Sequence, residues 1–237
     1  MKIACWSGPR NISTALMRSW SSRKDTFVTD EPLYAYYLNN KKLFHPMYEE
    51  IVKIYETDYN KVIKNLNSKI PFRKKYWYQK HMAHHLIDLN KIDWIKNFKN
   101  CILIRNPKDV ISSYTKKNKL INIEELGYAQ QVQIVKFLIK SGEKFLIIDS
   151  DDLLQNPKKY LSEWCFHLDI KFDQAMLKWE KGNHPNDGIW WQHWYDNVIK
   201  TTGFEKIKKK DNSIENKYVS IYNEAMQHYE YLKELQK

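Results

Sequence analysis

Short apolar runs recur along the chain, and longer amphipathic stretches separate them. Runs of this kind, bounded by polar residues, are typical of buried strands. Five of them predict strands, at 2–6, 26–29, 76–80, 100–104 and 144–149. Because helical patterns lie between most of these runs, we expect an α/β fold of three layers, in which helices cover both faces of a central, mainly parallel sheet. Ligands of such sheets bind at the carboxyl ends of the strands.

Apolar residues at helical spacing predict helices at 46–67, at 123–141 and at 215–235. The stretch 181–211 is the least regular part of the chain, and we expect it to form an ordered lid or part of a substrate site. No internal repeat or low-complexity linker divides the sequence. The 237 residues are therefore expected to form a single domain, 1–237.

The first predicted strand leads directly into the sequence Ser-Gly-Pro-Arg-Asn-Ile-Ser-Thr, residues 7–14. The glycine and proline shape a tight turn, and Ser13 and Thr14 place hydroxyl groups at the start of a helix. A loop that opens a helix directs backbone N–H groups and the positive end of the helix dipole at one spot, which suits phosphate or sulfate. Arg10 adds a fixed positive charge. An ordinary strand-to-helix connection is the alternative interpretation.

This loop differs from the nucleotide phosphate loop, G-x-x-x-x-G-K-[ST]. Counted from Gly8, Ser13 stands where the second glycine would be and Thr14 where the lysine would be. The basic residue lies earlier, at Arg10.

A second motif follows the fourth predicted strand and reads Arg-Asn-Pro-Lys-Asp-Val-Ile-Ser-Ser at 105–113. Pro107 suits the first turn of a helix. Arg105 at the strand end and Ser113 in the helix can converge on one phosphate, because arginine offers a two-pronged donor and serine a single one. The alternative is a capped helix with a surface salt bridge between Arg105 and Asp109.

Together these motifs resemble the superfamily of sulfotransferases that use 3′-phosphoadenosine-5′-phosphosulfate (PAPS). The family loop reads P-[KR]-S-G-[ST]-[ST], and here Asn11-Ile12 replaces its Ser-Gly. The family motif R-[ND]-P-x-D-x-x-x-S is present at 105–113. The segment 149–157 is similar to the family's Y-E-D-L-x-x-[ND]-P, with Ser150 in place of the tyrosine that helps to hold adenine. The sequences S-G-P-R-N-x-S-T, D-E-P-[LF]-Y and K-H-M-x-H-H resemble a bacterial branch of this superfamily.

The resemblance implies the three-layer fold of P-loop nucleoside-triphosphate-binding proteins, and transfer of a sulfuryl group from PAPS to a hydroxyl or amine acceptor. Adenosine-3′,5′-bisphosphate (PAP) is then the product, and no metal is expected. Arg105 and Ser113 would bind the 3′-phosphate. The 5′-phosphosulfate would be bound by the loop residues Ser7, Gly8, Pro9, Arg10, Asn11, Ile12, Ser13 and Thr14, with Arg10 also stabilising the leaving group.

Two general bases compete in this interpretation. Glu31 follows the second predicted strand, as the catalytic glutamate does in carbohydrate and tyrosyl-protein sulfotransferases, although an acidic pair at 30–31 also suits a helix start. Cytosolic sulfotransferases use K-x-H after the third strand, with lysine steadying the bridging oxygen. Lys80 matches that lysine, but His81 lies one position early. His81 and His85 have a metal-like spacing, yet no carboxylate completes a metal motif, so neutral histidines are favoured.

The aromatic stretch Gly-Ile-Trp-Trp-Gln-His-Trp-Tyr at 188–195 has two interpretations. It forms either a satellite core beneath the C-terminal helix or a wall for the acceptor or adenine.

The composition of the chain indicates the charge of its ligand and its cellular compartment. Lys and Arg outnumber Asp and Glu by 39 to 28, which suits an anionic ligand. Three separated cysteines in apolar surroundings fit the reducing cytoplasm, and no signal peptide or membrane span is evident. The expected partner is a small-molecule acceptor, while the oligomeric state stays open.

Two other functions remain open. A small-molecule kinase or another P-loop nucleotide-binding protein would need a carboxylate for magnesium, which Asp149 could supply. A non-catalytic module that binds nucleic acid would need clustered basic residues, and the only cluster, 206–210, is interpreted as a solvated loop.

Overall fold

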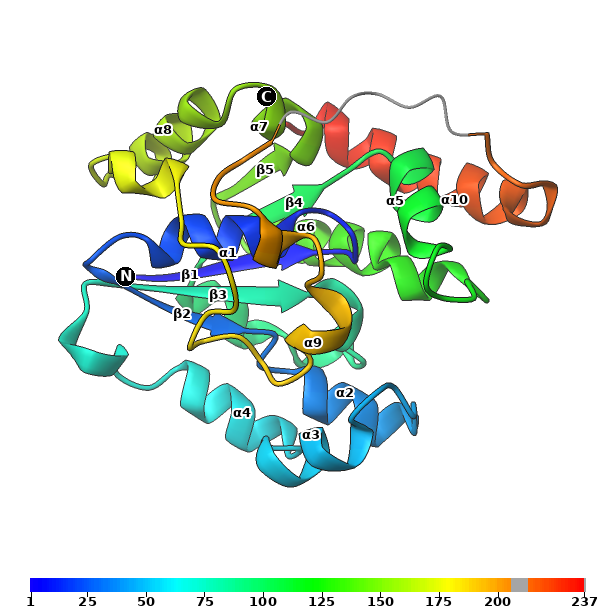
Figure 1. Cartoon of the computed structure of the whole chain (residues 1–237), viewed down its shortest axis with the longest axis horizontal. Coiled ribbons are helices and arrows are strands. Elements are labelled where there is room, and N and C mark those ends of the chain that lie inside the picture. Colours follow the sequence, from blue (N-terminus) through cyan, green and yellow to red (C-terminus); the bar gives the residue numbers. More distant parts are fainter. Residues whose placement is uncertain (206–212, 237) are drawn as a thin grey trace.

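The computed structural model describes residues 1–205 and 213–236. Its centre is a five-stranded, all-parallel sheet in the order β2-β3-β1-β4-β5 (Figure 1). Every predicted strand is confirmed, with ends that differ by one or two residues. The strands are β1 (Lys2–Ser7), β2 (Thr26–Asp30), β3 (Tyr76–Met82), β4 (Lys99–Ile104) and β5 (Phe145–Asp149).

Alternate residues of the central strand face two separate cores. Trp6 packs in the core that includes Val135 of α6 (Tyr128–Lys140). Cys5 packs in the core that includes Leu16 of α1 (Ser13–Ser21) and Trp164 of α8 (Pro157–His167). Because both faces are covered by helices, the strands are apolar almost throughout, as in other α/β sheets.

The remaining described helices lie around this framework (Figure 1), and some of them add to the core that contains Trp6, through Val62, Leu66 and Leu232. The α-helices among them are α2 (Tyr34–Lys41), α3 (Tyr48–Ile54), α4 (Tyr59–Leu66), α5 (Pro107–Tyr114), α7 (Ser150–Gln155), α9 (Trp191–Trp194) and α10 (Val219–Glu234). Single 3₁₀ turns lie at Pro71–Arg73, Ala83–His85, Leu89–Lys91, Asp93–Asn97, Ile123–Leu126, Gln174–Leu177, Val198–Lys200 and Asn216–Tyr218. No helix in the described residues is both long enough and apolar enough to cross a membrane.

The prediction of one helix over 46–67 is wrong, because the chain breaks between α3 and α4. Tyr55 has an extended backbone, and the side chain of Asp58 accepts a hydrogen bond from the backbone of Lys61. This cap starts a new helix despite the continuous apolar spacing.

The predicted helices at 123–141 and 215–235 are also shorter than expected. Gly127, with φ of 77°, separates the 3₁₀ turn Ile123–Leu126 from α6, since its left-handed backbone cannot continue a helix. The C-terminal helix α10 begins at Val219, after the 3₁₀ turn Asn216–Tyr218.

The aromatic stretch does not pack beneath α10. Trp190 and Tyr195 instead form a core with residues of α2 and α3, such as Tyr34 and Ile51. Segment 181–205 thus crosses to the β2 side of the sheet. The basic residues 206–210 and the end of the expected lid lie outside the described residues.

Candidate functional site

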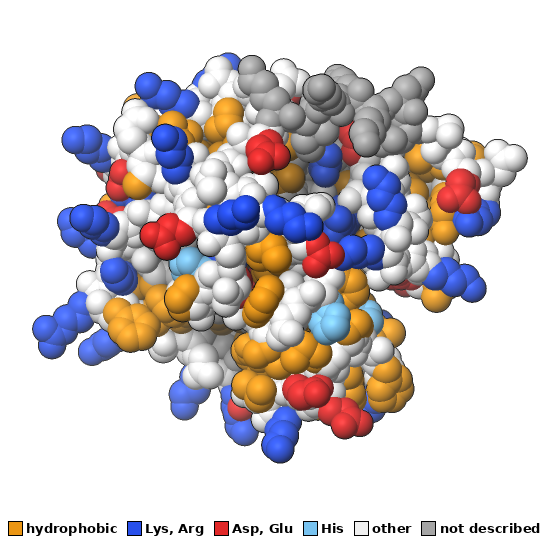
Figure 2. Space-filling model, viewed as in Figure 1, with side chains coloured by type: hydrophobic (Ala, Val, Ile, Leu, Met, Phe, Trp, Pro, Cys, Tyr) orange, Lys and Arg blue, Asp and Glu red, His pale blue; other side chains and the backbone are white. Residues whose placement is uncertain are grey.

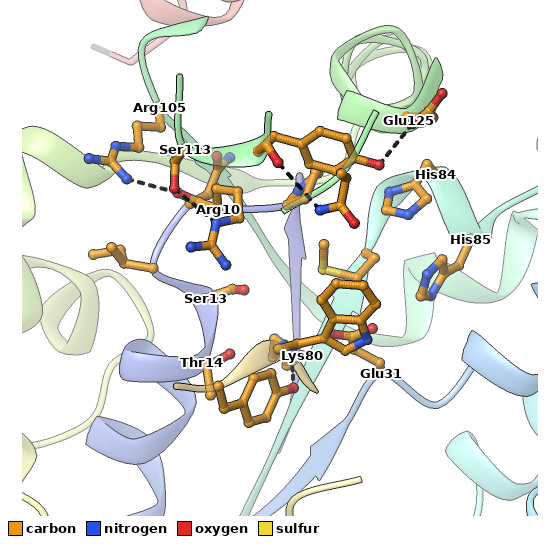
Figure 3. Close-up of a pocket in the computed structure, with 18 of the residues that line it drawn as sticks. Arg10, Ser13, Thr14, Glu31, Lys80, His84, His85, Arg105, Ser113 and Glu125 are labelled. Carbon is orange, nitrogen blue, oxygen red and sulfur yellow. Dashed lines mark hydrogen bonds and ion pairs between the residues drawn. The ribbon is translucent and has the colours of Figure 1, made fainter. Parts of the chain in front are cut away.

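A cavity of about 1050 Å³ lies at the carboxyl edge of the sheet (Figure 3). Residues that follow β1, β2, β3 and β4 line it, together with residues of segment 181–205. Its volume is at the upper end of the range for small-ligand sites, so it has room for more than one small molecule. The sequence motifs therefore meet in one place, as expected for strand ends of a parallel sheet.

The loop after β1 forms one wall of this cavity through Pro9–Thr14, whereas Ser7 and Gly8 do not line it. Two non-glycine residues of the loop have left-handed backbones, Arg10 with φ of 62° and Ile12 with φ of 59°. For a β-branched residue this conformation is strained. A Cβ on Gly8 would lie 2.3 Å from the carbonyl oxygen of Leu126, so this position has no room for a side chain.

Three hydrogen bonds hold the strained loop in place. The side chain of Asn11 donates to the carbonyl oxygen of Leu103 (3.1 Å), and Ser150 Oγ donates to the carbonyl oxygen of Asn11 (2.9 Å). Arg105 donates to the carbonyl oxygen of Arg10 (2.8 Å). Ser150 is fully buried in this role, so it supports the loop and does not replace the family tyrosine in the cavity.

The two sequence motifs meet at the cationic end of the cavity. Arg10 Nε donates to Ser113 Oγ (2.9 Å), although 103 residues separate them in the chain. Burial and the nearby Arg105 guanidinium both lower the pKa of Arg10. The nearest carboxylate to Arg105 is that of Asp151, at 3.5 Å, so the predicted alternative of a pair with Asp109 is not formed. Two guanidinium groups that repel each other in a half-buried place favour an anion between them.

The start of α1 adds backbone donors to this end. Its first residues line the cavity, and no side chain caps the helix. Ser13 and Thr14 are beside the cavity as expected (Figure 3).

An ion cluster forms the floor of the cavity. Lys80 Nζ donates to Asp30 (2.9 Å), to Glu31 (2.5 Å) and to the hydroxyl of Tyr195 (2.8 Å). The Tyr195 hydroxyl also lies 2.7 Å and 2.8 Å from the two Asp30 carboxylate oxygens, one of which accepts from the backbone of Gly188 as well. The alternative interpretation of the acidic pair as a helix start is not supported, since neither side chain caps α2.

The cluster changes the proton affinities of its members. Burial and the charge of Asp30 raise the pKa of Glu31, while Lys80 opposes them. Burial alone would lower the pKa of Lys80, but the two carboxylates outweigh it and raise that pKa. Burial and the same carboxylates raise the pKa of Tyr195 well above its usual value, so the phenol stays protonated. Glu31 also has a left-handed backbone, with φ of 41°.

His81 does not reach the cavity. Its ring is buried against Trp6, with ring centres 4.3 Å apart, and its Nε2 lies 3.1 Å from Gln79 Oε1. The sequence prediction extended β3 only to Lys80, but β3 continues to Met82. Because side chains of a strand alternate between faces, His81 points away from the side of Lys80 and Met82, which both line the cavity.

Several cavity residues had no specific role in the sequence prediction: Tyr34, Tyr37, His84, Tyr114 and Glu125. Tyr34 and His84 lie within the motifs D-E-P-[LF]-Y and K-H-M-x-H-H, which are the signals that could have indicated them. Trp194 and Tyr195 also line the cavity, and they belong to the aromatic stretch for which a core and a cavity wall were the two interpretations. Among the described residues, no group of three or more His, Cys, Asp or Glu side chains could hold a metal ion.

Asp149, the candidate magnesium ligand of a kinase, faces away from the cavity. Its carboxylate accepts from Tyr229 (2.6 Å) and Lys233 (2.9 Å) of α10, and it caps α7 by accepting from the backbone of Asp151 (2.8 Å). It therefore joins the C-terminal helix to β5.

Comparison with known families identifies the class to which this fold and cavity belong. The model of the sulfotransferase domain matches residues 1–234. The chain belongs to the sulfotransferase domain family.

Two curated relatives from Arabidopsis thaliana are each 37% identical over 207 residues, which covers 87% of this chain. They are named Branched-chain-amino-acid aminotransferase-like protein 1 and protein 2. The match covers 37% of each relative, so this chain spans little more than a third of their length.

Solved structures share the fold at low sequence identity. The sulfotransferase domain of the Synechococcus PCC 7002 olefin synthase has a TM-score of 0.58 and 15% identity, over 98% of this chain and 94% of its own. Mouse sulfotransferase SULT7A1, solved in complex with PAP, has a TM-score of 0.58 and 14% identity, over 99% of this chain and 88% of its own.

Removal of the Lys80 ammonium should destabilise the protein strongly. Lys80→Met leaves the carboxylates of Asp30 and Glu31 without their cation in a buried place, so we expect the free energy of unfolding to fall by about 3–5 kcal/mol. Urea denaturation at pH 7 measures this loss. Lys91→Met, which breaks the exposed pair with Asp88, is the control and should change stability little. An equally small loss of stability in both variants would contradict the conclusion that Lys80 neutralises buried carboxylates.

Acidification should destabilise the protein through histidines that the folded state keeps neutral. Burial lowers the pKa of His81 to about 3, and burial together with His45 lowers that of His84 to about 3. The unfolded chain binds these protons near pH 6.5, so below that pH it takes up protons that the folded state excludes. Stability should therefore fall from pH 6.5 toward pH 3, by about 1 kcal/mol per pH unit for each histidine.

Denaturation curves at pH 7, 6 and 5 test this dependence. His81→Phe should reduce the dependence of the free energy of unfolding on pH by the contribution of one histidine. A free energy of unfolding that is constant between pH 7 and pH 5 would show that these rings are not excluded from protonation.

Proposed function

We propose that this chain is an enzyme that transfers a sulfuryl group from PAPS to the hydroxyl or amine of a small-molecule acceptor. The observation that carries the proposal is the contact between Arg10 and Ser113, which unites the two phosphate motifs at one end of a cavity whose floor holds Glu31. Mouse sulfotransferase SULT7A1, which shares the fold, was solved in complex with PAP, and this supports the choice of donor.

The donor would lie along the cationic end of the cavity. The loop 9–14 and the start of α1 would bind the 5′-phosphosulfate through backbone N–H groups, Ser13 and Thr14. Arg105 and Ser113 would bind the 3′-phosphate. Because Arg10 and Ser113 already lie within hydrogen-bond distance of each other, a bound donor would accept from both groups and relieve the repulsion between the guanidiniums.

The transfer is an in-line displacement at sulfur. The acceptor oxygen forms the new S–O bond, the S–O bond to the 5′-phosphate breaks, and the acceptor proton passes to Glu31. Arg10 and the loop N–H groups stabilise the charge that develops on the leaving oxygen. Of the two candidate bases, the proposal keeps Glu31, because His81 lies outside the cavity.

The role proposed for Lys80 differs from the one that the family resemblance implies, which is to steady the bridging oxygen. All three of its N–H groups already donate to Asp30, Glu31 and Tyr195, so none is left for the bridging oxygen. Its charge opposes the burial that raises the pKa of Glu31. We therefore assign Lys80 a positioning role, in which it holds Glu31 and helps to keep it ionised.

The two other functions have less support. A kinase would need a carboxylate beside the phosphates, and Asp149 is engaged with α10 outside the cavity. For a nucleic-acid module, Figure 2 shows Lys and Arg spread over one face with acidic side chains among them. Buried, unpaired cysteines are compatible with a reducing compartment such as the cytoplasm.

Loss of Arg105 should remove the preference for a 3′-phosphate. We expect the wild-type protein to bind PAP more tightly than AMP, and Arg105→Ala to weaken PAP binding about tenfold or more while AMP binding changes less. Calorimetric titration with both nucleotides measures the difference. Lys119→Ala, which removes an exposed lysine at the cavity, controls for the general loss of charge. Equal binding of PAP and AMP to the wild-type protein would refute the donor assignment.

Glu31→Gln should separate binding from catalysis. The amide keeps the shape of the side chain but cannot take a proton, so we expect PAP affinity to be retained and turnover of PAPS to fall about a hundredfold or more. Turnover is followed as PAP release, with an alcohol acceptor or with water as a slow substitute. Glu124→Gln, at another carboxylate of the cavity, should retain turnover. Full activity of Glu31→Gln would require a different base.

A further inference from the structure

The end of the cavity opposite the phosphate motifs has its own chemistry. Figure 3 shows Arg10, Arg105 and Ser113 on one side of the cavity, His84 and His85 on the other, and Glu31 and Lys80 below both groups. Both histidines follow β3 in a single 3₁₀ turn, Ala83–His85, at the carboxyl edge of the sheet. Their rings therefore lie across the cavity from the guanidinium groups that would bind the donor (Figure 3).

Aromatic packing fixes the orientation of the two rings. His85 is 1% exposed and stacks on Tyr34 and Tyr37, with ring centres 5.1 Å and 4.7 Å apart. His84 packs edge-on against Tyr37 (5.2 Å) and against His85 (4.5 Å). Because these contacts fix the orientation of both rings, each ring nitrogen points in a defined direction.

The hydrogen-bonding of these rings is incomplete. Nδ1 of His84 and Nδ1 of His85 are buried without a partner, and no described residue bonds to either ring. A buried ring nitrogen that carries a proton but has no acceptor is less favourable than a buried unprotonated nitrogen that has no donor. The proton of each neutral ring should therefore reside on Nε2, which is not among the enclosed nitrogens.

The surroundings keep both rings uncharged. Burial lowers the pKa of His84 to about 3, and burial with His84 and Lys80 lowers the pKa of His85 well below its usual value. Glu31, Glu124 and Glu125 line the same cavity.

The lysines Lys41, Lys117 and Lys119 also line the cavity, but all are exposed at its solvent side, and Lys117 is paired with Asp196. No buried cation is therefore free at the histidine end of the described cavity to neutralise an anionic ligand.

We propose that His84 and His85 form the recognition site for the acceptor, where two Nε2–H groups donate to an uncharged oxygen of an acceptor alcohol. The acceptor then carries a second oxygen, such as an amide carbonyl or another hydroxyl, remote from the hydroxyl that faces Glu31. Anionic alcohols are excluded by the carboxylates and by the lack of a free buried cation. This inference rests on the proposed sulfuryl transfer, since it assigns the acceptor of that reaction.

Binding to the protein saturated with PAP tests the inference without catalysis. The probes are δ-hydroxyvaleramide, δ-hydroxyvalerate and hexanol, which share one hydroxyl and differ at the far end. We expect the amide to bind about tenfold more tightly than either of the others, as measured by calorimetry or by line broadening of the ligand signals. Tightest binding of the carboxylate or of hexanol would overturn the proposal.

Substitutions of the two histidines test whether they cause the preference for the amide. His84→Phe and His85→Phe keep the aromatic packing but remove the N–H groups, so each should lower the preference for the amide severalfold while PAP affinity is retained. His167→Phe, at an exposed position of α8, is the matched control and should keep the preference. An unchanged preference in both cavity variants would overturn the proposal.

The tautomer provides a readout on the wild-type protein, whether or not the variants fold. Long-range proton–nitrogen spectra of the imidazole rings distinguish Nε2–H from Nδ1–H, and δ-hydroxyvaleramide should shift the Nε2 signals of these two rings. Nδ1–H tautomers, or signals that do not respond to the amide, would refute the inference. Failure to bind PAP would instead refute the proposed function and the inference with it, so the two failures are distinguishable.

Discussion

The buried ammonium group of Lys80 is the interaction on which the site depends. It joins three parts of the chain, because its bonds reach Asp30 and Glu31 at the end of β2 and Tyr195 in segment 181–205. A lysine that is 1% exposed is tolerated only when its charge is paired and its donors are used. The same bonds position Glu31 and attach the irregular segment to the sheet, so the cavity floor and its wall form together.

Strain and electrostatic repulsion are concentrated where ligands would bind. Arg10, Ile12 and Glu31 have left-handed backbones, and all three line the cavity. Such conformations cost about 1–3 kcal/mol each and persist only when neighbouring contacts enforce them. The bonds from Asn11, Ser150 and Arg105 provide that enforcement for the loop. The loop thus presents a fixed array of hydrogen-bond donors, which would need little rearrangement to bind an anion.

Much of this arrangement could be predicted from the sequence, because it depends on local patterns. Apolar runs predicted all five strands, and strands of a parallel sheet bring the residues after their ends to one edge. That rule alone places Arg10, Glu31 and Arg105 near one another. The helix predicted at 46–67 failed because one capping residue, Asp58, overrides a continuous apolar spacing.

The sequence by itself therefore determined the strands, the parallel sheet and the gathering of the motifs at its carboxyl edge. Only the tertiary structure decided which side chains enter the cavity. The end of β3 at Met82 turns His81 into the core, and the crossing of segment 181–205 brings Tyr195 to Lys80, 115 residues away in the chain. Side-chain direction depends on the exact strand end, and long-range pairing depends on packing that no local pattern records.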